Sequence, residues 1–437
     1  MRDILIIGSG AREHVLAYSI SESDSQNRLY CIGSTVNPAI KELCYDYTVG
    51  DITDVEFILQ SITSWNIGLA VIGPEAPLST GVADALRAEG IPVFGPDRSL
   101  ARIETSKSYT RDLLETIVPE SSPIYQVIRN EAEAEKLLGR LGDYYVIKAD
   151  GLMGGKGVQV AGDHLHNHQE ALSYVKELLQ SSTQCVIEEK LIGQEFSLMT
   201  ITDGETSIHL PAVQDHKRAY NGDKGPNTGG MGSYTDTDHS LPFLSEEDIV
   251  SARELNEKVI GALAEDNGKP YRGVLYGGFM AVDDGVMIIE YNARFGDPEV
   301  MNLLSVVQTD FSELFYQAAV GTLKEVTIDL LPKASVCKYV VPEGYPTVSN
   351  KGAEIDISKI DDSCRLFLGS VDLKEGRLVT GGSRTAACIA IGDTIEEAER
   401  IAEAQIRRIN GDLFHRDDIG TTPLIELRIK AMKDLRA

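Results

Sequence analysis

The sequence has little positive charge and no long apolar run. Its 41 Lys and Arg residues are outnumbered by 67 Asp and Glu residues, giving a formal net charge of -26. A chain with this much negative charge repels the backbone of a nucleic acid, and no basic stretch offsets that repulsion. We therefore expect no nucleic-acid partner. No apolar segment approaches the roughly 20 residues of a membrane helix, so we expect no membrane partner.

Cysteine is also scarce. The six cysteines are scattered and form no Cys-x-x-Cys pair, which argues against a zinc site or a disulfide framework and favours reduced, structural thiols. The N-terminus has a strand-like start without the basic region and cleavage site of a signal peptide. We therefore expect a cytoplasmic protein.

The composition is that of an ordinary globular protein, with 42% apolar and 25% charged residues. At roughly 100–200 residues per domain, 437 residues predict about three domains. Four apolar runs that each end in glycine open the chain, and helical patterns follow the first and third. This alternation predicts an open parallel α/β sheet over residues 1–103, with ligands beyond the carboxyl ends of its strands.

The remaining patterns divide the chain further, and the fold class we predict is a multidomain combination of α/β and α+β units. We expect a linker helix at 104–122, a small lid at 123–190, a large unit at 191–330 and a small C-terminal α+β unit at 331–437. No internal repeat or low-complexity segment is visible.

The motif GSGAREH follows the first predicted strand. It lacks the third glycine of a dinucleotide fingerprint, where Glu13 stands, and no acidic residue follows the second strand, so NAD is disfavoured. Gly8 and Gly10 instead let a ribose phosphate approach a helix N-terminus, with Arg12 and His14 nearby. A plain tight turn is the alternative.

The segment KADGLMGGKG is the nucleotide motif. Lys148 closes a predicted strand, and the loop from Gly151 to Gly157 combines close backbone approach with a lysine charge, as a phosphate cradle requires. Because Lys156 is followed by glycine, it is not a Walker loop. A hairpin turn with incidental charge is the alternative.

The segment IEYNARFGDPE places Glu290, Asn292 and Arg294 at alternate positions, so all three share one face of a strand. Oxygen ligands suit a hard cation such as magnesium between protein and nucleotide phosphates. A strand with a solvated polar face is the alternative, but the accompanying phosphate loop favours the metal site.

Four polar residues precede a glycine-rich loop in VQDHKRAYNGDKGPNTGGMG, namely Asp215, His216, Lys217 and Arg218. This arrangement suits closure on an anionic intermediate, and the alternative is a mobile surface loop. Three alternate histidines in DHLHNH lie among polar residues and predict a solvated turn in preference to a metal site.

Together these motifs resemble ATP-grasp enzymes, and specifically the phosphoribosylamine-glycine ligase family. GSGAREH, IGPEAPL, FGP, IKADGLMGGKGV, VIEEKLIGQEFS, QDHKR, GPNTGGMG and EYNARFGDPE occur in the family's order along essentially the whole chain. The resemblance implies that residues 123–190 and 191–330 are the ATP-grasp lid and large domain. It also implies the monofunctional form, as a monomer or homodimer.

The resemblance implies roles for individual residues as well. The ATP-binding positions are Lys107, Lys148, Gly154, Gly155, Lys156, Gly157, Glu188, Glu189, Lys190, Leu191 and Glu195. The substrate-binding positions are Gly8, Gly10, Arg12, Glu13, His14, Pro74, Glu75, Gly229, Gly230 and Arg294. Glu290 and Asn292 hold Mg2+ or Mn2+. The catalytic positions are Arg294, Lys217, Arg218 and Asp215, with Arg294 expected to grip the glycine carboxylate.

The implied reaction joins glycine to 5-phosphoribosylamine at the expense of ATP, through glycyl phosphate, in the second step of purine synthesis. The alternatives are another ATP-grasp ligase or carboxylase and a nucleotide-binding regulator without catalysis. The sequence departs from related enzymes at Gly278, where others often carry a second acidic metal ligand, and in VTGGSRTAA of the C-terminal unit.

Overall fold

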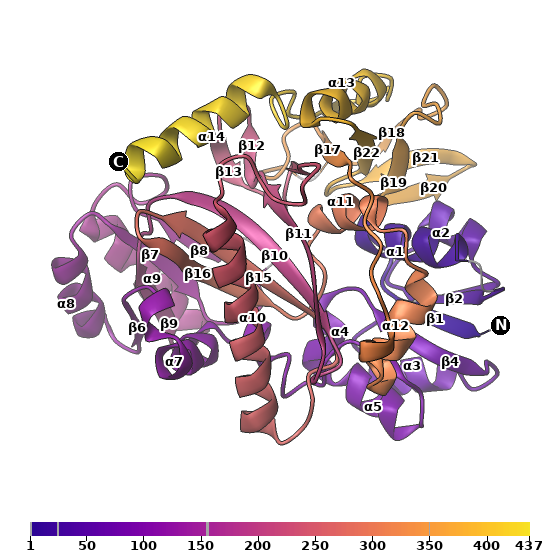
Figure 1. Cartoon of the computed structure of the whole chain (residues 1–437), viewed down its shortest axis with the longest axis horizontal. Coiled ribbons are helices and arrows are strands. Elements are labelled where there is room, and N and C mark those ends of the chain that lie inside the picture. The colour runs from indigo at the N-terminus through magenta and orange to yellow at the C-terminus, as the bar shows by residue number, and fades with distance from the viewer. Residues whose placement is uncertain (1, 24–25, 154–156, 349) are drawn as a thin grey trace.

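The computed structural model describes residues 2–23, 26–153, 157–348 and 350–437 (Figure 1). Its first unit is an open sheet of five parallel strands in the order β3-β2-β1-β4-β5. The strands are β1 (Asp3–Ile7), β2 (Arg28–Gly33), β3 (Asp46–Val49), β4 (Ile67–Ile72) and β5 (Val93–Phe94). The accompanying helices are α1 (Ala11–Ser21), α2 (Pro38–Leu43), α3 (Val55–Ser61), α4 (Glu75–Thr80) and α5 (Val82–Ala88).

Every residue of β1 is buried, which is typical of a parallel strand covered on both faces. The predicted N-terminal α/β sheet is thereby confirmed. Gly8 follows β1 directly and adopts a φ of 118°, a conformation that glycine tolerates at little cost.

A small unit with its own apolar core lies at one end of the molecule, at the left of Figure 1. Its antiparallel sheet has the order β6-β9-β7-β8. The strands are β6 (Tyr125–Ile128), β7 (Tyr145–Ala149), β8 (Val158–Val160) and β9 (Cys185–Glu189), and the helices are α8 (Glu131–Leu141) and α9 (His168–Ser181). Helices α6 (Arg102–Thr105) and α7 (Lys107–Ile117) and the short 3-10 helix η1 (Pro119–Ser121) connect it to the first unit.

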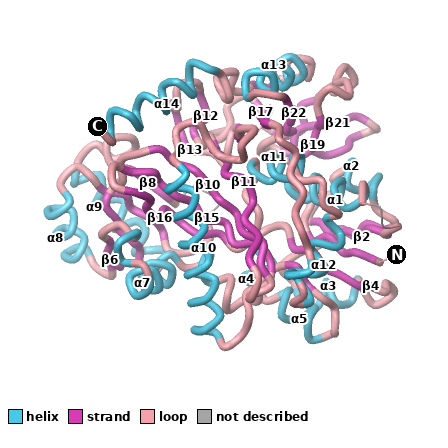
Figure 2. The backbone as a smooth tube through the Cα atoms, viewed as in Figure 1, coloured by secondary structure: helices cyan, strands magenta, loops and turns pink. Residues whose placement is uncertain are grey.

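A nine-stranded sheet forms the centre of the molecule, and Figure 2 shows its strands running between peripheral helices. Its order is β16-β15-β10-β11-β14-β17-β22-β19, with β23 also paired to β17. The strands before residue 331 are β10 (Gln194–Thr202), β11 (Ser207–Asp215), β14 (Gly232–Thr235), β15 (Gly273–Val282) and β16 (Gly285–Asn292). Those after it are β17 (Ala334–Pro342), β19 (Arg365–Leu368), β22 (Ala386–Gly392) and β23 (Leu413–Phe414).

The pairing of β14 with β17 carries this sheet across the boundary we predict at residue 331. The large and C-terminal units therefore share one sheet, although the predicted domain boundaries themselves stay predictions. Smaller antiparallel pieces are β12 (Arg218–Tyr220) with β13 (Lys224–Asn227), and β18 (Lys351–Glu354), β21 (Arg377–Gly381) and β20 (Val371–Lys374).

Helix α10 (Glu246–Asn267) packs on β15 and β16, and its ends follow local rules. Ser245 and Asp248 form a capping box at its N-terminus, and Gly268 ends it in a left-handed conformation. The other helices of this half are α11 (Glu299–Val306), α12 (Phe311–Val320), α13 (Ile395–Ile406), α14 (Thr422–Leu435) and the 3-10 helix η2 (Leu323–Glu325).

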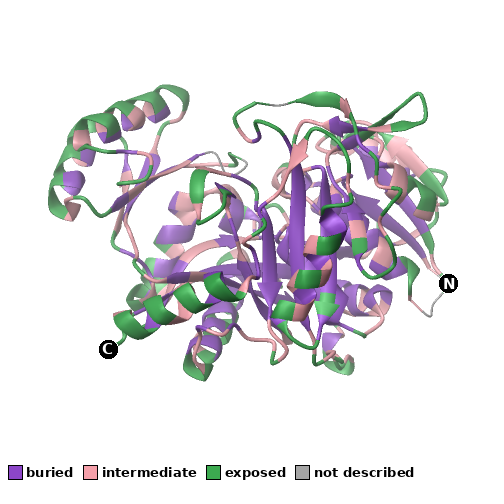
Figure 3. Ribbon diagram, turned by 90° about the horizontal axis from the view of Figure 1, so that it is seen from above, coloured by how far each residue is buried: buried purple, intermediate pink, exposed green. Residues whose placement is uncertain are grey.

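Burial is concentrated in the central strands, as Figure 3 shows. The six cysteines are all unpaired and five of them are buried. Within the described ranges, no helix combines the length and hydropathy that a membrane crossing needs.

Candidate active site

A cavity of about 660 Å³ lies where the four predicted units meet. This volume falls in the range of roughly 300–1,000 Å³ that is usual for small-molecule sites. Arg12 of the first unit, Lys148 of the small unit, Glu290 of the large unit and Arg384 of the C-terminal unit all line it. The cavity therefore joins segments that are far apart in the sequence.

One wall is built on a buried cluster of two cations and one carboxylate. Arg111 of α7 donates to both carboxylate oxygens of Glu188, at 2.8 and 2.7 Å, and Lys148 Nζ lies 2.8 Å from Glu188 Oε2. Burial raises the pKa of Glu188, but the charges of Arg111 and Lys148 outweigh it and bring the pKa to about 2. The cluster therefore keeps one net positive charge beside the cavity.

Lys148 is fixed by more than this ion pair. Its Nζ also donates to the backbone oxygen of Ile289 on β16, at 3.0 Å, so the lysine ties the small sheet to the large one. Burial lowers the pKa of Lys148, and the charge of Glu188 opposes that shift. A preorganised lysine at this place suits an anionic phosphate.

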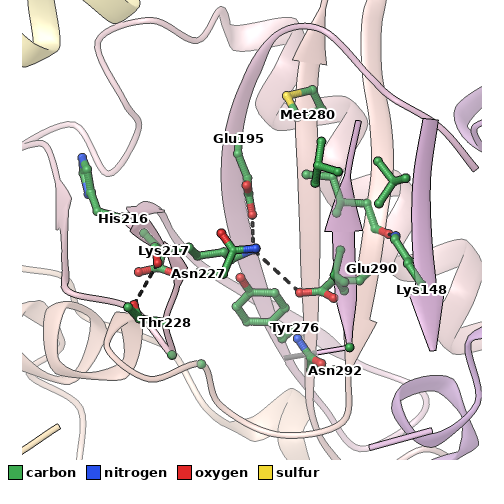
Figure 4. Close-up of a pocket in the computed structure, with 18 of the residues that line it drawn as sticks. Lys148, Glu195, His216, Lys217, Asn227, Thr228, Tyr276, Met280, Glu290 and Asn292 are labelled. Atoms are coloured by element: carbon green, nitrogen blue, oxygen red, sulfur yellow. Dashed lines mark hydrogen bonds and ion pairs between the residues drawn. The ribbon is translucent and has the colours of Figure 1, made fainter. Parts of the chain in front are cut away.

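Lys217 occupies the middle of the cavity between two carboxylates (Figure 4). It pairs with Glu195, and its Nζ lies 3.8 Å from Glu290 Oε1. Burial lowers the pKa of Lys217, but the charges of Glu195, Glu290 and Asp215 outweigh burial and raise it. Burial likewise opposes the ionisation of Glu290, whose pKa is lowered by Lys217 and Lys148. Both groups are therefore charged at neutral pH.

Glu290 and Asn292 lie at alternate positions of β16 and both line the cavity, as the spacing predicts. Gly278 pairs with Glu290 across the sheet, so the neighbouring strand offers no second carboxylate there. Among the described residues, no group of three or more His, Cys, Asp and Glu side chains has the arrangement of a metal site. One carboxylate and one amide fit a hard cation that takes its remaining ligands from phosphates and water.

Arg294 extends from the same segment toward the first unit. Its guanidinium lies 2.9 Å from Glu104 Oε1 and 3.3 Å from Glu75 Oε2, and Arg12 approaches the same Glu75 oxygen at 4.0 Å. Burial raises the pKa of Glu75, but the charges of Arg294 and Arg12 lower it to about 2. The first turns of α1 and α4 and the segment after β16 thus meet in a network of charges.

Asp215 and Glu299 form an acidic corner of the cavity. Glu299 is buried at the start of α11 and accepts a hydrogen bond from Tyr276 Oη at 2.9 Å. Asp215 Oδ1 is buried and has no hydrogen-bond partner among the described residues. Burial, reinforced by the charge of Glu299, raises the pKa of Asp215 well above its usual range.

Several predicted residues do not line the cavity. His14 is buried against Phe367, and its Nδ1 accepts a hydrogen bond from Leu368 N at 2.8 Å, while burial lowers its pKa to about 4. Glu13 accepts hydrogen bonds from Gly10 N and Arg12 Nε, so it shapes the loop. The others outside the cavity lining are Gly8, Gly10, Pro74 and Gly230. Gly154, Gly155 and Lys156 lie outside the described residues.

The remaining predicted residues line the cavity, and they comprise Lys107, Gly157, Glu188, Glu189, Lys190, Leu191, Glu195, Arg218 and Gly229 in addition to those described above. Arg218 reaches the small unit, with Nη2 2.6 Å from Asp163 Oδ2 and Nη1 3.2 Å from His164 Nε2. The histidine-rich turn therefore contacts the cavity wall through His164.

Sequence reasoning missed Arg111 and Arg384. Arg111 is a charged residue on the buried face of α7, and such a residue is itself an indication of a buried ion pair. Arg384 follows a pair of glycines shortly before the buried strand β22, but its partners, three backbone oxygens and the carboxylate of Asp297, belong to distant loops. No local pattern indicates such partners.

Family models match three consecutive parts of the chain. They describe the N domain of phosphoribosylglycinamide synthetase at residues 2–104, its ATP-grasp domain at 105–300 and its C domain at 335–422. An N5-carboxyaminoimidazole ribonucleotide synthetase in an ADP complex shares the fold, with a TM-score of 0.65 at 16% identity over 93% of this chain and 96% of that one. The fold and the cavity thus define an ATP-grasp protein.

Relatives of similar sequence show which family of ATP-grasp proteins the chain is similar to. The phosphoribosylamine-glycine ligase of Methanosarcina barkeri is 45% identical over 433 residues, which cover 99% of each chain. That of Methanopyrus kandleri is 44% identical over 450 residues and the full length of both. The crystal structure of the Thermotoga maritima ligase has a TM-score of 0.80 at 29% identity, covering 95% of this chain and 100% of that one. The chain belongs to the phosphoribosylamine-glycine ligase family.

Proposed function

We propose that the protein joins glycine to 5-phosphoribosylamine with ATP, giving glycinamide ribonucleotide, ADP and phosphate in the second step of purine synthesis. The observation that carries this proposal is a single cavity lined by Lys148, by Glu290 with Asn292, and by Arg12 of the first unit. Relatives that are 40–45% identical over nearly the whole chain bear the name of this activity. Its substrates are small molecules, and a cytoplasmic monomer or homodimer stays our expectation.

ATP is proposed to lie between the small and large sheets. Lys107 and Lys148 face its phosphates, the segment Glu188 to Leu191 borders the adenine, and Glu195 faces the ribose. Lys148 is held by Glu188 and by Ile289 before ATP arrives, so its charge needs little reorganisation during the reaction. Glu290 and Asn292 would hold Mg2+ or Mn2+, which when bound offsets negative charge on the phosphates.

In the first step a carboxylate oxygen of glycine attacks the γ-phosphorus of ATP. The new bond from oxygen to phosphorus forms as the bond to ADP breaks, giving glycyl phosphate. The carboxylate of glycine and the phosphates of ATP are both anionic, so cations must offset the repulsion between them. We assign this role to Lys217 and Arg294, which line the cavity and are each paired with carboxylates.

In the second step the amine of phosphoribosylamine attacks the carbonyl carbon of glycyl phosphate. The bond from carbon to nitrogen forms, phosphate leaves, and the nitrogen loses a proton. Asp215 is our candidate for accepting this proton, because it lines the cavity and its Oδ1 has no hydrogen-bond partner among the described residues. Arg218, which reaches across to Asp163, is placed to hold the cavity closed against water.

The direct test is to incubate the purified protein with ATP, glycine, phosphoribosylamine and magnesium and to identify the product by mass. We expect glycinamide ribonucleotide and ADP in equal amounts. Hydrogencarbonate in place of glycine tests the alternative of a carboxylase. The proposal is contradicted if no ADP forms with all three substrates. It is also contradicted if a product forms with hydrogencarbonate but none forms with glycine.

A further inference from the structure

Arg384 belongs to the C-terminal unit, and its side chain lines the active-site cavity. Its Nη1 donates to three backbone oxygens, those of Gly229 at 2.6 Å, Gly230 at 3.2 Å and Asp297 at 2.8 Å. Its Nη2 lies 3.0 Å from Asp297 Oδ2. The side chain is only 16% exposed although it lines the cavity.

These contacts join two loops that form the acidic side of the cavity. Gly229 and Gly230 follow the hairpin that begins after Lys217, and Asp297 stands between Arg294 and Glu299. The loops are closely packed, because a side-chain carbon added at Gly230 would overlap Pro298 and lie 2.7 Å from Asp215 Oδ1. Movement of one loop therefore displaces the other.

The surroundings of Arg384 fix its orientation as well. Its guanidinium carbon lies 4.6 Å above the ring of Tyr339, and Tyr339 Oη donates to Asp297 Oδ1 at 2.7 Å. Burial lowers the pKa of Arg384, but the charge of Asp297 outweighs it and raises the pKa, so the group stays charged. The planar group thus meets a ring, a carboxylate and three carbonyl oxygens, a set that the single ammonium of lysine cannot reproduce.

We propose that Arg384 is a positioning residue for the acceptor side of the cavity. It holds the Gly229–Gly230 loop against the Asp297 loop, so that the acyl phosphate meets the amine and not water. This inference rests on the proposed function. Without the clamp, water attacks the carbonyl carbon of glycyl phosphate and returns glycine and phosphate, and ADP forms without product.

The test compares Arg384→Gln, Arg384→Lys and the control Arg377→Gln, which removes an exposed arginine of the same unit paired with Glu354. For Arg384→Gln we expect the KM for phosphoribosylamine to rise about tenfold or more, the KM for ATP to stay within about twofold, and ADP to exceed product. Arg384→Lys retains the positive charge, and its KM values and ADP-to-product ratio should lie between those of the wild type and of Arg384→Gln. The control should match the wild type in all three quantities.

Hydrogen exchange of the ligand-free proteins gives a second readout that does not depend on turnover. We expect faster exchange at residues 228–231 and at Gly296 and Asp297 in both Arg384 variants, with unchanged exchange in the rest of the fold and an unchanged thermal midpoint. Unchanged exchange together with one ADP per product overturns the inference, as does a loss of kcat that only follows the folded fraction. A wild type that makes no product contradicts the proposed function instead, and the exchange result still decides the role of Arg384.

Discussion

At the scale of single residues, Glu290 is the position where charge matters most to the proposed chemistry. The substitution Glu290→Gln keeps the size of the side chain but removes the charge that faces Lys217 and the proposed metal. We expect kcat to fall about 100-fold or more while the Kd for ATP changes far less, because the lost charge acts on the transferring phosphoryl group. Steady-state kinetics and calorimetry measure the two quantities.

The matched control for this prediction is Glu354→Gln, an exposed carboxylate on β18. It should leave both kcat and the ATP affinity unchanged. Turnover by Glu290→Gln at the wild-type rate contradicts the metal assignment.

The second prediction for a single residue concerns Glu188 and the dependence of protein stability on pH. Its pKa falls from 4.5 to about 2 on folding, so its ionised form stabilises the native state above pH 4.5, and this stability is lost as the pH falls toward 2. Glu188→Gln leaves Arg111 and Lys148 without their anion and should lower the free energy of unfolding by about 3–5 kcal/mol at pH 7.

Urea unfolding of both proteins at several pH values between 7 and 3 measures this effect. The difference between wild type and Glu188→Gln should shrink as the pH falls below 4.5. A difference that is the same at every pH shows that the charge of Glu188 contributes nothing to stability.

At the scale of elements, the loop between β13 and β14 depends on Gly230. Its φ of 111° disfavours any other residue, and an added carbon would overlap Pro298. Gly230→Ala should therefore lower the free energy of unfolding by about 1–3 kcal/mol and reduce turnover. Thermal and urea unfolding provide the measurement.

Gly139, in the last turn of α8, is the matched control. A carbon added there meets no atom within 4 Å, and its backbone is helical. Gly139→Ala should stabilise the protein by about 0.5–1 kcal/mol. Equal effects at the two positions would show that backbone conformation does not decide the result.

Local patterns predicted some elements and missed others. The strands of the first unit and the alternation of Glu290 and Asn292 on β16 follow directly from apolar runs and the period of a strand. The short strand β14 does not, because it has only four residues and pairs with the distant strand β17. The hydrogen bonds of Arg384 to backbone oxygens could not be predicted either, because their acceptors are also far away in the sequence.

At the scale of the whole molecule, the acidic surface has a thermodynamic consequence. A net charge of -26 repels itself most strongly in the compact state, and salt screens that repulsion over about 10 Å at 0.1 M. We expect the thermal midpoint to rise with added potassium chloride between low and molar concentrations. Calorimetric scans measure it, and a midpoint that falls with salt would show that internal ion pairs outweigh the surface repulsion.

The multidomain class and the order of units could be predicted because each unit has its own periodicity and motifs. The sharing of one sheet by the large and C-terminal units could not, because β14 and β17 are separated by a long stretch of other elements. The meeting of the units at the cavity follows from the same long-range packing.

The pairing of β14 with β17 has a consequence for synthesis on the ribosome. Until β17 emerges, one edge of β14 presents unpaired backbone groups that invite association with other chains. The residues that we propose to bind the nucleotide are made well before Arg384 and Arg428, which line the cavity from the C-terminal unit. A nascent chain can therefore fold its first units early, but the cavity is complete only when the C-terminal unit has been made.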